Sequence, residues 1–170
     1  TFCDLTIEDC GCDSTRLDKT LSFDWGVLSP LPYDEPFTGR YPNDFFSAKW
    51  TGYIASPGTG EYEFVLSADY SAKVTIGGVV YVDSDEPLAK SKMTFKVSMT
   101  TDVKVPIEIV YYHYQANAYF SLSWSGPGIS SLTPVGGNNL FYGREIMNSP
   151  VTVEIYPGFW DDTTSSATGA

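Results

Sequence analysis

The stretch Met93–Met99 reads Met-Thr-Phe-Lys-Val-Ser-Met, with an apolar side chain at every odd position and a polar one at every even position. Successive side chains of a β-strand point to opposite faces of a sheet, so this alternation is typical of a strand with one buried face. The same period of two recurs in Tyr62–Leu66, Val105–Tyr111 and Phe120–Trp124. The chain therefore contains several half-buried strands.

Turn-forming residues separate these strands. Gly77 and Gly78 lie between the apolar runs Lys73–Ile76 and Val79–Val82, and a Gly-Gly pair favours a tight hairpin because both residues tolerate a positive φ. Further turn signals occur at Pro57–Gly60 and Gly126–Gly128. Short strands at this spacing, with little helix, predict an all-β antiparallel sandwich or barrel.

Both ends of the chain differ from its middle. Residues 1–15 are polar and contain Cys3, Cys10 and Cys12, an odd number, so at least one partner must lie outside this set if they form disulfides. We expect disulfides and an oxidising compartment; free thiols in a frayed terminus are the alternative.

Residues 147–170 are interpreted as a linker, one further strand at 151–156 and a polar tail. The strand is either the start of a following immunoglobulin- or filamin-like repeat or a last edge strand of the main domain. Residues 16–146 form the main domain in this division of the chain.

The charge balance excludes two classes of partner. Lys and Arg total 10 against 21 Asp and Glu, which gives a net charge of -11, and the basic residues form no stripe. Nucleic acids and anionic membranes both require a concentrated positive surface. No apolar run is long enough to cross a bilayer, so we expect no membrane insertion by this segment.

The sequence contains no recognised catalytic pattern. His113 is the only histidine and has no cysteine nearby, so it supports neither a metal cluster nor a catalytic triad, and we interpret it as a polar residue at a strand end. Asp83, Asp85 and Glu86 are interpreted as a solvated acidic loop. There is no phosphate-binding glycine loop and no Gly-x-Ser-x-Gly turn, so we predict that the chain is not an enzyme.

An ordered series of segments resembles the PA14 domain family. It runs through Phe45–Ile54, Pro57–Asp69, Ala72–Gly78, Ile107–Tyr112 and Leu122–Gly128, and the resemblance extends over roughly residues 16–146. It implies an antiparallel two-sheet β-sandwich in an extracellular or cell-surface setting. In the adhesins of this family the domain is a calcium-dependent lectin, in which two adjacent aspartates of one loop and an asparagine of a second loop bind the ion.

The resemblance places a candidate ligand-binding face at Asp69, Tyr70, Tyr114, Gln115 and Asn117. Asp69 matches the first aspartate of the family and Asn117 matches the asparagine, which makes them the candidate ligands for calcium. Tyr70 stands where the second aspartate is expected, and a protonated phenol is a poor ligand for calcium. The alternative is structural: Asp69 caps a turn, Asn117 occupies a hairpin tip and the tyrosines pack.

The function expected from these features is carbohydrate recognition in cell adhesion, by a module of a larger cell-surface or secreted protein. Its partner would be a glycan on a cell or matrix surface. The alternative is a structural or protein-interaction spacer domain without a lectin site.

Overall fold

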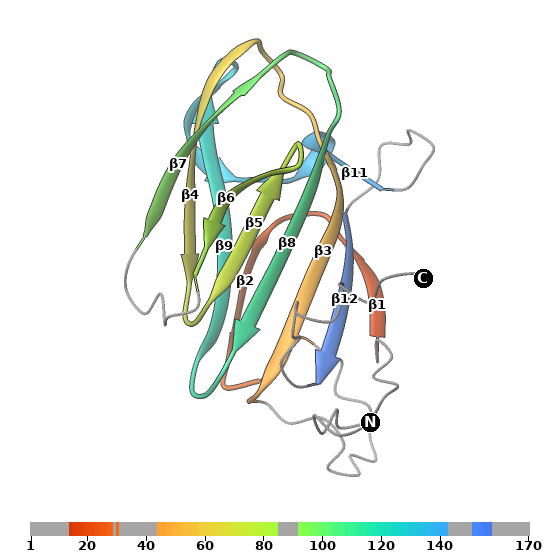
Figure 1. The fold of residues 1–170 in the computed structure, drawn as a ribbon, viewed down its shortest axis with the longest axis vertical. Coiled ribbons are helices and arrows are strands. Elements are labelled where there is room, and N and C mark those ends of the chain that lie inside the picture. Colours follow the sequence, from red (N-terminus) through yellow and green to blue (C-terminus); the bar gives the residue numbers. More distant parts are fainter. Residues whose placement is uncertain (1–13, 29, 31–43, 85–91, 143–150, 158–170) are drawn as a thin grey trace, which may run out of the picture.

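The fold is an antiparallel two-sheet β-sandwich, as the sequence predicts (Figure 1). The computed structural model describes residues 14–28, 30, 44–84, 92–142 and 151–157 of the chain. Within these residues the only helical element is a single 3₁₀ turn, η1, at Gly137–Asn139. No described helix combines the length and the apolar character that crossing a membrane requires.

The larger sheet has seven strands, and β11 pairs with β3 beside the main path. Along that path the order is β1 (Ser14–Asp18), β12 (Val151–Pro157), β3 (Phe46–Ile54), β8 (Val105–His113), β5 (Ala72–Ile76) and β6 (Val79–Asp83), with β11 at Leu140–Phe141.

The smaller sheet has five strands, and β2 pairs with β9 beside its main path. Its order is β10 (Ile129–Pro134), β9 (Ala118–Gly126), β4 (Gly60–Ala68) and β7 (Met93–Met99), with β2 at Ser22–Gly26.

The strands predicted from alternation are confirmed. β7 covers the stretch Met93–Met99, and its polar positions are exposed while Val97 and Met99 are buried. β5 and β6 form the predicted hairpin, with φ of 61° at Gly77 and 78° at Gly78. Strands such as β10 were not predicted, because most of its side chains are exposed and carry no buried alternation.

The strand near the C-terminus lies inside the larger sheet. β12 pairs with β3 on one side, from Thr152–Thr51 to Pro157–Phe46, and with β1 on the other. Cys3, Cys10 and Cys12, the acidic residues Asp85 and Glu86, and residues 147–150 and 158–170 lie outside the described residues.

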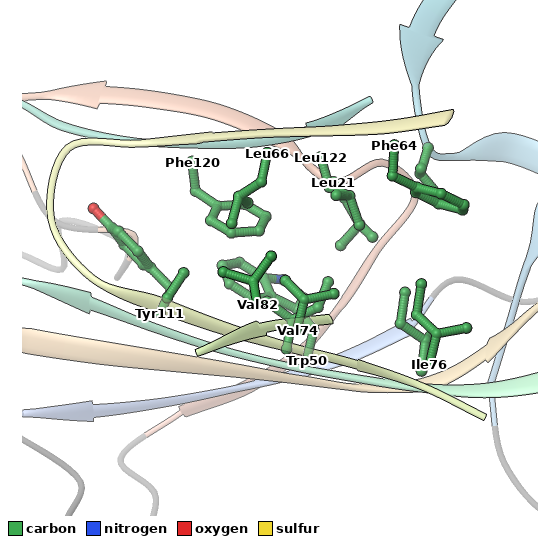
Figure 2. Close-up of a cluster of buried hydrophobic side chains, with 14 of the residues drawn as sticks. Leu21, Trp50, Phe64, Leu66, Val74, Ile76, Val82, Tyr111, Phe120 and Leu122 are labelled. Atoms are coloured by element: carbon green, nitrogen blue, oxygen red, sulfur yellow. The ribbon is translucent and has the colours of Figure 1, made fainter. Parts of the chain in front are cut away.

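The core fills the space between the two sheets with apolar and aromatic side chains (Figure 2). Trp50 of β3 stacks on Phe120 of β9, with ring centroids 4.8 Å apart, and so joins the two sheets. The indole Nε1 of Trp50 donates a 3.0 Å hydrogen bond to Asp18. This bond satisfies a buried polar atom, which would destabilise the fold if it had no partner. Burying each large side chain contributes roughly 1.5–3 kcal/mol.

Several connections meet at one end of the sandwich, where β8 ends and β3 begins. The register pairs Phe46 with His113, Ala72 with Tyr111 and Ala68 with Phe120. The β4–β5 turn and the β8–β9 turn therefore lie at this end, together with the residues that precede β3. We call this the loop end and define it as residues 44–45, 69–71 and 114–117.

Candidate functional site

Three aromatic side chains from separate segments meet at the loop end. The rings of Tyr70 and Tyr114 stack with centroids 5.6 Å apart and an interplanar angle of 25°. The ring of Phe45 meets that of Tyr114 edge-on at 4.8 Å. Tyr114 is 43% exposed, and Phe45 and Tyr70 are half-buried. We call these three residues the aromatic platform.

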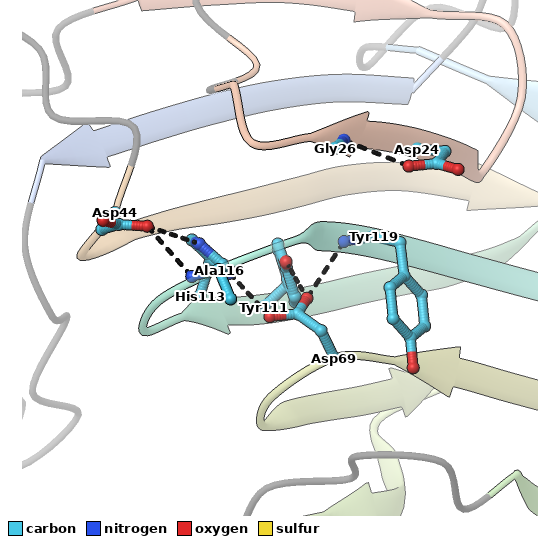
Figure 3. Close-up of polar contacts among 8 residues, drawn as sticks. All are labelled: Asp24, Gly26, Asp44, Asp69, Tyr111, His113, Ala116 and Tyr119. Carbon is cyan, nitrogen blue, oxygen red and sulfur yellow. Dashed lines mark hydrogen bonds and ion pairs between the residues drawn. The ribbon is translucent and has the colours of Figure 1, made fainter.

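Asp69 is next to Tyr70 in sequence, but its carboxylate turns into the sandwich. Oδ1 accepts hydrogen bonds from the Tyr111 hydroxyl and, at 3.1 Å, from the backbone N–H of Tyr119. Oδ2 lies 2.6 Å from Nδ1 of His113. The Asp69 backbone N–H also donates to the Tyr119 carbonyl. Asp69 thus joins the β4–β5 turn to strands β8 and β9 (Figure 3).

His113 is fully buried at the end of β8, against the ring of Phe46 at 4.9 Å. Since a carboxylate has no hydrogen to donate, the imidazole donates from Nδ1 to Asp69. Its Nε2 lies 3.5 Å from Oδ1 of Asp44 without hydrogen-bond geometry, and it makes no hydrogen bond to any residue the structure describes.

The residues before β3 hold the β8–β9 turn. Asp44 Oδ1 accepts a 3.2 Å hydrogen bond from the Ala116 N–H, and the Phe45 N–H donates to the Tyr114 carbonyl at 2.9 Å. Phe45 has φ of 59° and Ala116 has φ of 78°. A side chain in this left-handed region costs roughly 1–2 kcal/mol, so the surrounding contacts must enforce both conformations.

The electrostatics of the cluster favour a protonated Tyr111. Its burial, the negative charge of Asp69 and the hydrogen bond to Asp69 raise the pKa of the Tyr111 hydroxyl well above its ordinary value. The hydroxyl therefore keeps its hydrogen and remains a donor to Asp69 throughout the physiological pH range.

The structure divides the candidate residues into two groups. Tyr70 and Tyr114 come together, and Gln115 and Asn117 are exposed in the β8–β9 turn beside Tyr114. Asp69 faces away from them and is bound to strand residues rather than to its own turn.

Asp44 and Phe45 were not identified from the sequence, and no local signal marks them. Their place in the site depends on the register between β3 and β8, which pairs Phe46 with His113, 67 positions later in the sequence. The inward direction of His113 was predictable, because it continues the odd-numbered row of Ile107, Ile109 and Tyr111.

Among the described residues, no group of three or more His, Cys, Asp or Glu side chains is arranged to hold a metal ion.

The sequence profile of the PA14 domain matches residues 14–136. The chain belongs to the PA14 domain family. A curated relative of this PA14 domain is the anti-sigma-I factor RsgI3 of Acetivibrio thermocellus, which is 27% identical over 112 residues, or 65% of this chain and 16% of that protein.

Two solved structures extend the comparison. An anti-sigma factor domain-containing protein from Clostridium clariflavum is 26% identical with a TM-score of 0.65, over 78% of this chain and 42% of that one. A subtype-switched epithelial adhesin A domain from Candida glabrata, in complex with β-lactose, is 17% identical with a TM-score of 0.53, over 78% of this chain and 65% of that one. The likeness to the adhesin domain shows that the two proteins share a fold. This PA14 domain spans less than half the length of either anti-sigma factor protein.

Proposed function

We propose that this PA14 domain is a non-catalytic, carbohydrate-binding module of a larger secreted or cell-surface protein, and that it binds its glycan at the loop end. The observation that carries the proposal is the stack of Tyr70 on Tyr114, which two separate turns bring together beside the exposed amides of Gln115 and Asn117.

The chemistry of this surface suits a sugar. A pyranose ring has an apolar face of C–H groups that packs on an aromatic ring, while its hydroxyls need hydrogen-bond partners. The platform offers rings, and the two amides offer both donors and acceptors. The strained backbone at Phe45 and Ala116 supports a preorganised surface, which reduces the entropy lost on binding.

The comparisons support a binding role in two ways. The domain shares its fold with a Candida glabrata adhesin domain that was solved with β-lactose. The PA14 family assignment agrees with a module that binds a ligand within a longer protein.

Isothermal titration of the chain against a glycan panel that includes lactose tests this proposal. Tyr70→Ala and Tyr114→Ala should each weaken binding of the best glycan by about tenfold or more, which corresponds to about 1.4 kcal/mol. Tyr142→Ala is the matched control, because Tyr142 is 46% exposed and follows β11 at the opposite end of the sandwich, so its loss should leave affinity unchanged.

Two results would reject the proposal. The first is the absence of binding to every glycan at millimolar concentration. The second is a glycan whose affinity falls equally for Tyr142→Ala and Tyr114→Ala, since it would then bind away from the platform.

A second candidate function is a protein-interaction or spacer role within a longer signalling protein. It is favoured by the sequence identities of 27% and 26% to anti-sigma factor proteins, against 17% to the adhesin domain. Cross-linking of the full-length parent protein would support this candidate if a defined protein partner contacts the domain and Tyr114→Ala leaves that contact intact. A glycan bound at the platform would favour the first candidate instead.

A further inference from the structure

The PA14 resemblance implies a calcium ion at the Asp69 loop, and the residues present do not suit one. Calcium takes six to eight oxygen ligands at about 2.3–2.6 Å, usually with carboxylates among them. The position after Asp69 is Tyr70, whose ring is engaged in the stack with Tyr114. The only carboxylate of the pair is therefore Asp69, whose side chain is 11% exposed.

The Asp69 carboxylate is also occupied by hydrogen-bond donors. A carboxylate offers about four lone-pair positions. Tyr111 and the Tyr119 N–H fill two of them at Oδ1, and His113 fills a third at Oδ2. One position remains at Oδ2, and a cation there would lie close to hydrogens that carry positive partial charge. Binding through both oxygens would in addition displace at least one of the two donors at Oδ1.

The same hydrogen bonds join the segments that an ion would otherwise hold together. Asp69 lies in the β4–β5 turn, while Tyr111 and His113 lie on β8, just before the β8–β9 turn. On the far side of that turn, Tyr119 bonds Asp69 through both backbone groups. Asp44 then ties the tip of the turn at Ala116.

We propose that this hydrogen-bonded cluster of Asp69, Tyr111, His113 and Tyr119 replaces the metal ion, so that the aromatic platform forms without calcium. The cluster fixes the two turns, and Tyr70 and Tyr114 follow Asp69 and His113 directly in sequence. Asp69 is thus a positioning residue and not a ligand to an ion. The role of the platform in glycan binding rests on the function proposed above, but its formation can be measured without any glycan.

The decisive experiment is NMR of the chain in EDTA and in millimolar calcium, with cross-relaxation between the Tyr70 and Tyr114 rings as the readout. We expect the same inter-ring signals in both solutions and no saturable change on addition of calcium. Signals that appear only with calcium would overturn the proposal. Failure to bind any glycan would leave this result untouched, so the two proposals fail separately.

A calorimetric titration with calcium chloride provides an independent measurement. Extracellular calcium modules bind with dissociation constants of about 10⁻⁴–10⁻³ M, so millimolar calcium would reveal such a site. We expect no saturable heat. One equivalent of calcium bound by the wild type and lost in Asn117→Ala would overturn the proposal, and this variant changes only an exposed turn residue.

The positioning role predicts the effect of removing the carboxylate. Asp69→Ala should abolish the inter-ring signals while the signals between Phe64 and Phe95, which stack at 5.3 Å elsewhere in the sandwich, remain. Retention of the Tyr70–Tyr114 signals in a folded Asp69→Ala variant would overturn the role of the cluster. Where this variant does not fold, the wild-type comparison in EDTA and calcium still decides.

Discussion

Tyr111 donates its hydroxyl hydrogen to the carboxylate of Asp69, from strand β8 to the β4–β5 turn, 42 residues away in sequence. The Tyr111 ring is fully buried, in contact with Trp25, Phe46 and Phe120. A polar link from the core to the loop end therefore runs through one phenol, and two measurable consequences follow from it.

Removal of this hydroxyl should destabilise the domain. Tyr111→Phe keeps the ring packing and deletes one donor to a carboxylate, and hydrogen bonds to charged groups contribute about 1.5–3 kcal/mol. His113 and Tyr119 still donate to Asp69, so we expect a loss near the lower end of that range in urea unfolding at neutral pH. An unchanged unfolding midpoint would contradict the hydrogen bond.

The raised pKa of Tyr111 predicts how stability changes with alkaline pH. Its ordinary pKa is 10.0, so above that pH the unfolded chain releases this proton while the folded chain retains it. The folded state then binds more protons than the unfolded state, and stability falls as pH rises. This residue contributes up to about 1.4 kcal/mol per pH unit.

Urea unfolding on both sides of the ordinary tyrosine pKa measures this slope. In Tyr111→Phe the free energy of unfolding should fall less steeply with pH than in the wild type, by up to about 1.4 kcal/mol per pH unit. Tyr142→Phe, at an exposed position, is the control and should retain the wild-type slope. Equal slopes for all three proteins would show that Tyr111 titrates normally in the folded state.

Gly126 is required by the close approach of Tyr62. A Cβ at Gly126 would lie 2.5 Å from Cδ1 of the buried Tyr62 ring. The Tyr62 hydroxyl is hydrogen-bonded to Gly58 and Pro127, so the ring has no room to retreat. Overpacking of this kind costs about 1–3 kcal/mol, and Gly126→Ala should lower stability by an amount in the upper part of that range.

Gly26→Ala separates this steric effect from backbone strain. Gly26 has φ of +58°, but no atom lies within 4 Å of an added Cβ, so only the left-handed conformation opposes the substitution. We expect a loss of about 1 kcal/mol in thermal or urea unfolding, smaller than that for Gly126→Ala. The opposite order would contradict the packing argument at Tyr62.

The sequence predicted strands more reliably than it predicted the contacts of the site. Alternation reports directly on one buried face, and β7 matched its predicted bounds because its polar and apolar residues alternate without interruption. β2 was not predicted from alternation, because it has only two apolar side chains, Phe23 and Trp25, and none of its five residues is fully buried.

The direction of Asp69 illustrates why the site was harder to predict. In the structure Asp69 lies in the β4–β5 turn, and the rings of Tyr70 and Tyr114 stack. Whether the carboxylate points outward or inward depends on which donors the register brings near it. His113 and Tyr119 are 44 and 50 residues from Asp69, and no local pattern encodes such distances.

Trp50 has a polar role in addition to its packing. Trp50→Phe removes the indole N–H that donates to Asp18 at 3.0 Å, and Asp18 is 8% exposed. The substitution therefore leaves a buried carboxylate whose remaining side-chain partner, among the residues that the structure describes, is Arg16. The smaller phenyl ring also leaves part of the indole volume empty. Together, the two effects should lower the free energy of unfolding, measured in urea, by about 3 kcal/mol or more. Asp18→Asn retains an oxygen that accepts from the indole, and its cost should be less than half as large.

Ala116 tests the strain that positions the β8–β9 turn. Its φ of 78° costs a non-glycine residue roughly 1–2 kcal/mol, and glycine loses roughly 0.5–1 kcal/mol of additional chain entropy on folding. Ala116→Gly should therefore stabilise the domain by about 0.5 kcal/mol. Ala116→Val should destabilise it, because a β-branched side chain is less tolerant of a positive φ. Urea unfolding of the three proteins should give the stability order Gly, Ala, Val. Ala116→Gly could instead lower the stability as much as a glycine placed within a strand does. That result would mean that residue 116 does not adopt the left-handed conformation in solution.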